Sequence, residues 1–265
     1  MTDTDALRAF GEKVDFGRTA SDYSTYRAGF PPDFFAALTA RGTVLPGQKA
    51  VDLGTGTGTL ARGLAQAGLQ VTGIDIAPDL LAAAAALDVK AAIKITYKEA
   101  PAEATTLPDQ SAQLVTAGQC WHWFDRPRAA SEAHRLLTPG GRILIAHFDW
   151  LPLPGTLVAA TENLILRHNP DWAGAGGTGI YPAWLTDLAV AGFSEIETAS
   201  FDTHQSYSHA AWRGRIRASA GIAASLSSEA VDEFDAELTA MMENHFPENP
   251  ARVPHRVWWV TARKP

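Results

Sequence analysis

The residues best suited to bind a ligand are three glycines that follow a short apolar segment. Gly54, Gly56 and Gly58 alternate between a run typical of a buried strand and a run typical of a helix. Glycine adopts positive φ and has no Cβ, so a ligand can lie against the backbone. Asp75 ends a second predicted strand, at residues 70–76, where a carboxylate can accept hydrogen bonds from both hydroxyls of a ribose. The pairing predicts a nucleoside site beyond the carboxyl ends of parallel strands.

Two ligands compete for this glycine turn. Residues 56–61 fit the dinucleotide fingerprint, with Asp75 near the expected distance, which would make the chain an NAD-dependent oxidoreductase. That frame begins two residues late relative to the strand end, and in the frame that begins at Gly54 the sixth position is Thr59 instead of glycine. Alternating glycines after an acidic strand favour a nucleoside that carries an amino acid. A tight strand-to-helix connection without a ligand is the structural alternative.

Four segments, taken together, resemble a known family. Residues 51–58, 73–76, 102–115 and 134–142 are similar, in register, to the motifs of class I S-adenosylmethionine (SAM)-dependent methyltransferases of the small-molecule branch. The resemblance implies a Rossmann-like α/β fold, a mostly parallel seven-stranded sheet with helices on both faces, an N-terminal cap and an insert after the fifth strand. It also implies SAM as cofactor, S-adenosylhomocysteine (SAH) as product and no metal.

The amino-terminal stretch 22–31 resembles the subgroup that includes trans-aconitate methyltransferases. In such relatives a tyrosine and an arginine close over the methionine end of the cofactor, which here implies Tyr26 and Arg27, with Tyr23 on the substrate side. A guanidinium can hold a carboxylate through two parallel hydrogen bonds. The alternative makes Arg27 a surface cation and leaves the tyrosines to pack the cap.

The resemblance and the position after strand ends together predict the cofactor-binding residues. Pro101 stands where relatives often carry an aspartate that contacts adenine, so adenine recognition is expected from the Ala102 backbone or from Glu103. The full predicted set is Tyr26, Arg27, Asp52, Gly54, Thr55, Gly56, Gly58, Asp75, Ile76, Ala102, Glu103, Ala117 and Gln119.

The loop after the fourth predicted strand, residues 117–125, is rich in aromatic side chains. Trp121 and His122 are expected to line an acceptor pocket, since apolar walls with few polar groups are usual for small-ligand sites. The alternative makes the next two residues, Trp123 and Phe124, core residues. The predicted substrate-binding set is Tyr23, Trp121, His122, Trp150 and Trp172. The eight tryptophans of the chain favour an aromatic acceptor.

Methyl transfer from SAM is a direct displacement, so the protein mainly aligns the reactants, and a hydroxyl or ammonium acceptor additionally needs a base. His122, His147 and Asp149 are the candidate bases, because they follow strands that end at the same crevice. Either histidine could instead be a structural residue. A protein that binds SAM or another ligand without catalysis is a further alternative.

The composition limits the other classes of function. The chain has 265 residues, a net charge of −7 and one cysteine, which favours a cytoplasmic protein, monomeric or homodimeric, that binds neither nucleic acid nor membrane. We expect a single methyltransferase domain. Its parts are a cap at 1–45, a SAM-binding core at 46–150, an insert or lid at 151–180, and the rest of the core with a helical insertion at 181–265.

Overall fold

The structure is a computed structural model, and it describes residues 29–217, 219, 221–222 and 225–265. The chain divides into two compact units, which we describe separately. The sheet unit comprises Gly29–Phe148, Tyr181–Ser200 and Val257–Pro265. The described part of the helical unit lies within Asp149–Ile180 and Phe201–Arg256. The predicted insert at 151–180 thus shares a unit with residues 201–256.

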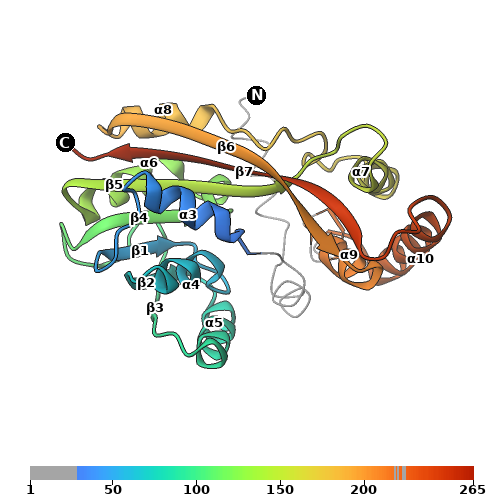
Figure 1. Cartoon of the computed structure of the whole chain (residues 1–265), viewed down its shortest axis with the longest axis horizontal. Coiled ribbons are helices and arrows are strands. Elements are labelled where there is room, and N and C mark those ends of the chain that lie inside the picture. The colour runs from blue at the N-terminus through green and yellow to red at the C-terminus, as the bar shows by residue number, and fades with distance from the viewer. Residues whose placement is uncertain (1–28, 218, 220, 223–224) are drawn as a thin grey trace. The chain divides into compact units, whose positions relative to one another are not determined.

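Seven strands form one sheet with the order β3-β2-β1-β4-β5-β7-β6 (Figure 1). The strands are β1 (Lys49–Leu53), β2 (Gln70–Asp75), β3 (Thr96–Glu99), β4 (Ala112–Gly118), β5 (Leu137–Trp150), β6 (Ser194–Tyr207) and β7 (Ala251–Arg263). Among β1 to β5, all neighbouring strands pair in parallel. The strand β7 runs antiparallel to β5, because Gly140 donates to the carbonyl of Lys264 and Leu151 donates to that of Pro254. The prediction of a mostly parallel Rossmann-like sheet is confirmed.

Helices cover both faces of the sheet in the sheet unit. They are α3 (Pro32–Ala40), α4 (Thr59–Gln66), α5 (Pro78–Ala91), α6 (Arg126–Leu136) and α8 (Ala183–Val190). Alternate side chains of a strand point to opposite faces, and β7 illustrates the result. Trp258 and Val260 belong to the core that includes α6 and α8, whereas Trp259 meets Phe34 of α3 with ring centroids 5.6 Å apart.

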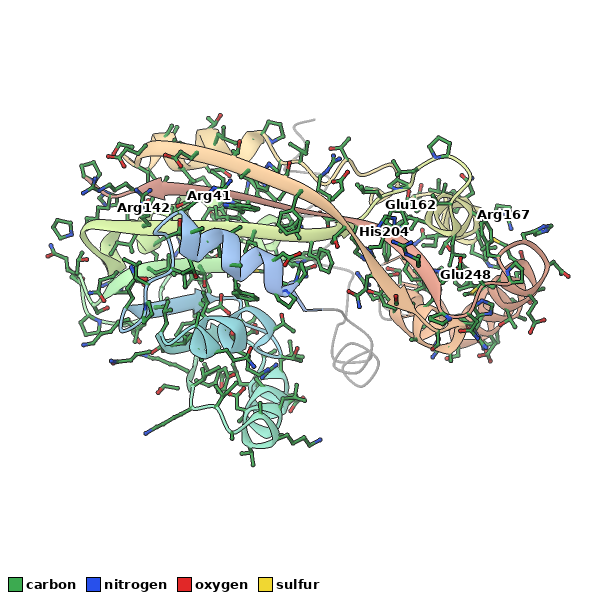
Figure 2. The ribbon with its side chains drawn as sticks, viewed as in Figure 1. Arg41, Arg142, Glu162, Arg167, His204 and Glu248 are labelled. Atoms are coloured by element: carbon green, nitrogen blue, oxygen red, sulfur yellow. The ribbon has the colours of Figure 1, made fainter. Side chains whose placement is uncertain are left out.

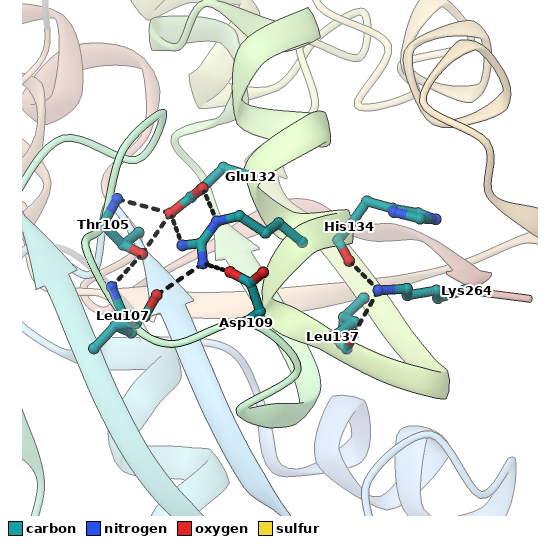
Figure 3. A network of polar contacts seen from close by, with 8 residues as sticks. Thr105, Leu107, Asp109, Glu132, His134, Leu137 and Lys264 are labelled. Carbon is teal, nitrogen blue, oxygen red and sulfur yellow. Dashed lines mark hydrogen bonds and ion pairs between the residues drawn. The ribbon is translucent and has the colours of Figure 1, made fainter.

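A polar network joins α6 to the loop before β4 (Figure 3). The guanidinium of Arg135 donates to both carboxylate oxygens of Glu132 and to the carbonyl of Leu107, over 2.7–2.8 Å. Glu132 also accepts from the N–H and the hydroxyl of Thr105, at 2.8 and 2.6 Å. These bonds hold the pKa of Glu132 below its usual range against the opposing effect of burial. The network fixes the loop that follows residues 102–103.

The helical unit packs α7 (Leu157–His168), α9 (His209–Arg217) and α10 (Ser228–His245) around a core that contains Trp212 and Phe234. Within this unit, the carboxylate of Glu162 (labelled in Figure 2) accepts from the N–H of Gly176 at 2.8 Å and from Nε1 of Trp150 at 2.7 Å. The glycine-rich run around Gly176 is therefore tied to α7.

No helix among the described residues is both long and apolar enough to cross a bilayer.

Candidate functional site

The three glycines after β1 all adopt positive φ, at 60° for Gly54, 55° for Gly56 and 76° for Gly58. A Cβ on Gly54 would lie 2.8 Å from the ring of Phe124, and one on Gly58 would lie 2.6 Å from the hydroxyl of Tyr97. A Cβ on Gly56 would meet nothing within 4 Å. Two of the glycines therefore let other parts of the protein pack closely, and Gly56 is the one that faces open space.

Asp75, at the end of β2, meets the glycine turn directly. Its Oδ2 accepts the N–H of Gly56 at 2.8 Å, and its Oδ1 accepts the N–H of Ala77 at 3.0 Å. A carboxylate oxygen has two lone pairs, so each oxygen keeps an acceptor position for a ligand hydroxyl. The next residue, Ile76, exposes 70% of its surface. A half-buried carboxylate beside an exposed apolar side chain suits a ribose joined to a flat base.

Asp52 supports the turn from within the sheet. It is 1% exposed and accepts the hydroxyls of Thr55 at 2.7 Å and Thr116 at 2.6 Å. Burial raises the pKa of its carboxyl group to about 6, and the two hydroxyls partly oppose this rise. Asp52 was predicted to bind the cofactor, but in this structure it reaches the turn through Thr55 and has almost no surface of its own.

A second support joins the turn to the two following helices. Arg62 of α4 donates to the carbonyl of Thr57 and pairs with Asp88 of α5. Asp88 also accepts the hydroxyl of Tyr97 at 2.8 Å. The sequence analysis missed this group. Only the position of Arg62, one helical turn after Gly58, could have suggested it.

The loop after β4 packs against the glycine turn. Gln119 has a positive φ of 61° and donates its N–H to the carbonyl of Ala146 at 2.8 Å. Cys120 places its Sγ 3.2 Å from the carbonyl oxygen of Leu53, the last residue of β1. Glu103 accepts the N–H of Asp125 at 2.8 Å, so one of its carboxylate oxygens holds this loop.

The tryptophan that this loop places in the core is Trp121. It is 0% exposed, and its Nε1 donates to Asp187 of α8 at 3.2 Å. Trp123 and Phe124, for which a core position was the alternative, are half-buried. The difference arises in the 3₁₀ turn Trp121–Trp123, which points its first ring inward. Trp121 therefore offers no open surface to an acceptor.

Two of the three candidate bases lie close together. The ring centroids of His122 and His147 are 5.3 Å apart, and His147 also meets Tyr181 at 4.5 Å and Trp184 at 4.9 Å. His147 is 3% exposed, whereas His122 is half-buried. His122 therefore keeps more accessible surface than His147, although its Nδ1 is buried.

The remaining predicted residues fall into three groups. Asp149, Trp150 and Trp172 belong to the helical unit, where Trp172 is 7% exposed within the core. The ring of Trp150 meets Trp212 at 5.6 Å. Three further residues lie outside the described part of the chain, namely Tyr23, Tyr26 and Arg27. The residues Ala102 and Ala117 are buried, with 5% and 1% of their surface exposed.

The chain matches a known family over the segment that contains this turn. Residues 51–145 match the family described as "Methyltransferase domain". This segment of the chain is therefore similar to a methyltransferase domain. Among the described residues, no group of three His, Cys, Asp or Glu side chains could hold a metal ion.

Methyltransferases among curated proteins and solved structures are similar to this chain. An uncharacterized methyltransferase of Mycobacterium tuberculosis is 36% identical over 134 residues, which are 49% of this chain and 50% of the relative. The chain thus spans about half the length of the curated relatives that it first matches.

Two solved structures share the fold. A structure described as a type II methyltransferase from Anaeromyxobacter dehalogenans has a TM-score of 0.63 at 24% identity and covers 91% of this chain and 99% of that one. The phosphoethanolamine N-methyltransferase 2 of Haemonchus contortus, in complex with phosphomonomethylethanolamine and SAH, has a TM-score of 0.57 at 23% identity. It covers 98% of this chain and 60% of that one. The fold is therefore the Rossmann-like methyltransferase fold.

Proposed function

We propose that this chain transfers a methyl group from SAM to a small-molecule acceptor, leaving SAH. The observation that carries the proposal is the joining of Asp75 to the glycine turn through the N–H of Gly56. This contact brings Asp75, the residue proposed to bind the ribose, to the backbone position that faces open space. The match of residues 51–145 to the methyltransferase domain family supports the same reading.

The residues of the turn fit an adenosyl ligand. Gly56 leaves room for a ligand against the backbone, and Asp75 keeps acceptor positions for the two ribose hydroxyls. The exposed side chain of Ile76 supplies an apolar surface for the adenine. The carbonyl of Ala117, in the adjacent strand β4, and Gln119, which directly follows that strand, are proposed to hold the amino-acid end.

When bound, the cofactor supplies an activated methyl group and its own leaving group. The protein's contribution is then to hold the acceptor in line with the reacting carbon, which lowers the entropic part of the barrier. Asp52 and Arg62 contribute by fixing the turn, since both reach it through hydrogen bonds from neighbouring elements. The half-buried His122 is the residue proposed to act on the acceptor.

The acceptor is proposed to be a small molecule that is methylated on oxygen, nitrogen or carbon. The net charge of −7 disfavours binding to a phosphate backbone. The aromatic loop after β4 supports a flat, aromatic acceptor. Hydride transfer with NAD is the competing activity on this turn.

Transfer of label distinguishes these activities. The protein and methyl-tritiated SAM are incubated with the small-molecule fraction of a cell extract and, in separate reactions, with its protein fraction and its nucleic-acid fraction. We expect label in the small-molecule fraction, and much less with Asp75→Ala. Asp79→Ala removes an exposed carboxylate nearby and serves as the matched control. Label in the protein or nucleic-acid fraction alone would contradict the proposed acceptor class, and no transfer into any fraction would contradict the activity.

A further inference from the structure

A cluster of aromatic side chains surrounds His147 at the carboxyl ends of β4 and β5. The ring of Tyr181 lies 4.5 Å from that of His147 and stacks on Trp184, with centroids 4.1 Å apart and an interplanar angle of 8°. Trp258 of β7 meets both Tyr181 and Trp184 at 5.7 Å. All of these residues belong to the sheet unit.

Burial separates this cluster into a supporting layer and an accessible one. His147, Trp184 and Trp258 are 3%, 2% and 3% exposed, so they cannot touch a ligand without rearrangement. His122, Trp123 and Tyr181 are half-buried and keep accessible surface. The rings of His122 and Trp123 are themselves in contact, with centroids 4.6 Å apart. We name these three residues, His122, Trp123 and Tyr181, the aromatic face.

The aromatic face is anchored beside the glycine turn. His122 and Trp123 lie in the 3₁₀ turn that directly follows Cys120, and the Sγ of Cys120 lies 3.2 Å from the carbonyl oxygen of Leu53. Leu53 immediately precedes Gly54. A ligand on this face would therefore lie near the place proposed for the reacting end of the cofactor.

We propose that the aromatic face binds a flat phenolic acceptor and that His122 takes up its proton. This inference rests on the proposed function, which supplies the methyl donor. Aromatic rings favour stacked and edge-on contacts with another flat ring. The three side chains include no carboxylate that would hold an ammonium group. They do include an imidazole, a group that can act as a general base toward a hydroxyl.

The transfer balances with these groups alone. The phenolic O–H bond breaks, and its proton moves to an imidazole nitrogen of His122. The phenolate oxygen forms a bond to the methyl carbon, and the electron pair of the breaking carbon–sulfur bond stays on sulfur. The products are an aryl methyl ether and SAH, and the proton leaves His122 for solvent.

The same geometry assigns different roles to the two histidines. His122 is the residue that touches the acceptor. His147 is a positioning residue, because it is 3% exposed and enclosed by the rings of His122, Tyr181 and Trp184. Tyr181 is assigned a role in specificity, because it packs against the ring of His147 that His122 also contacts and keeps accessible surface.

The test measures binding to the SAH-loaded protein with two probes of similar size. The probes are 2-naphthol, which is flat and phenolic, and decahydro-2-naphthol, which is neither. We expect 2-naphthol to bind at least about tenfold more tightly, because stacking between aromatic rings changes the binding affinity by about a factor of ten. Equal binding of the two probes, or no binding of 2-naphthol at its solubility limit, would overturn the proposal.

Variants tie the binding to the aromatic face. Tyr181→Leu keeps an apolar side chain and is expected to weaken 2-naphthol binding about tenfold while leaving SAH binding unchanged. Val190→Ala, on an exposed residue of the helix α8 that follows Tyr181, is expected to change neither. If the unsubstituted protein does not bind SAH, that result contradicts the proposed function itself. Normal SAH binding with an unaffected Tyr181→Leu would contradict only the acceptor site.

Proton NMR of the histidine rings tests the role of His122. Its ring signals are identified by their loss in His122→Gln, and those of His168 in the helical unit serve as the internal control. We expect 2-naphthol to shift the signals of His122 in the SAH-loaded protein and to leave those of His168 unchanged. Signals of His122 that do not move while 2-naphthol binds would rule out its contact with the acceptor.

Discussion

The carboxylate of Asp75 accepts the backbone N–H of Gly56 at 2.8 Å, across 19 residues of chain. Through this bond the end of β2 holds the one glycine of the turn that faces open space. A second carboxylate oxygen accepts the N–H of Ala77, so the side chain is fixed before any ligand arrives. A carboxylate that is already oriented loses little conformational entropy when it binds a ribose.

The glycines of the turn should respond differently to alanine. Gly56→Ala and Gly58→Ala both force a residue with a Cβ into positive φ, at a cost of about 1–2 kcal/mol each. Only Gly58→Ala adds a clash, with the hydroxyl of Tyr97 at 2.6 Å. We therefore expect Gly58→Ala to be the less stable protein in chemical denaturation, and Gly56→Ala to lose SAH affinity out of proportion to its stability.

A second substitution checks this explanation. Tyr97→Phe removes the hydroxyl that a Cβ on residue 58 would meet, and it also removes a hydrogen bond to Asp88. In a double-mutant cycle, Tyr97→Phe should restore part of the stability lost in Gly58→Ala. Additive losses would mean that the clash is not the cause.

The buried Asp52 should make stability depend on pH. Its pKa in the folded protein is raised to about 6, above the value of about 3.9 in an unfolded chain. Between these values the folded protein holds more protons, so the free energy of unfolding falls as the pH rises from about 4 to about 6. The difference between the wild-type protein and Asp52→Asn should therefore change by about 2–3 kcal/mol over this range.

Chemical denaturation of both proteins between about pH 4 and pH 7.5 measures this difference. The substitution Asp52→Asn keeps a side-chain oxygen and supplies a nitrogen for the hydroxyls of Thr55 and Thr116, but the amide does not titrate. A difference between the two proteins that stays constant with pH would show that Asp52 ionises normally.

Arg62 should stabilise both the turn and the helices that follow it. Its side chain is 15% exposed, and that of its partner Asp88 is 6% exposed. Arg62→Met keeps the aliphatic stem but leaves Asp88 with a buried charge, which typically costs about 3–5 kcal/mol. The further change Asp88→Asn should recover part of that loss in thermal or chemical denaturation. No recovery would show that the charge on Asp88 is not the cause.

Arg62 also predicts an effect on binding. Because it donates to the carbonyl of Thr57, the Arg62→Met variant should bind SAH more weakly even where it is fully folded. Arg128→Met, on an exposed arginine of α6, is the matched control. Equal SAH affinity in the two variants would limit Arg62 to a role in stability.

The sheet and the turn could be predicted because their signals are local. Short apolar runs that alternate with helical segments predict a parallel sheet, and the strand β2 ends within one residue of the predicted range 70–76. The helix α5 begins at Pro78, because a proline in the first turn leaves no internal hydrogen bond unmade. The convergence of His122 and His147 follows from the same topology, since β4 precedes His122 and the adjacent parallel strand β5 contains His147.

The finer features depend on contacts between residues far apart in sequence. The different surroundings of Gly54 and Gly56 are set by Phe124 and Cys120, which no spacing rule relates to the turn. The pairing of Arg62 with Asp88 is of the same kind. The inward orientation of Trp121 depends on a 3₁₀ turn and on Asp187 of α8, so the choice among neighbouring tryptophans could not be made from the sequence.

The measurement that tests the account most directly is a calorimetric titration of the protein with SAM, SAH and NAD, repeated on Asp75→Ala and on Asp79→Ala. We predict micromolar binding of both adenosyl ligands and none of NAD, with affinity lost by at least about tenfold in Asp75→Ala, as expected when a charged hydrogen-bond acceptor is removed. Asp79→Ala should bind as the unsubstituted protein does. Binding of NAD alone, or adenosyl binding that is indifferent to Asp75, would contradict the account.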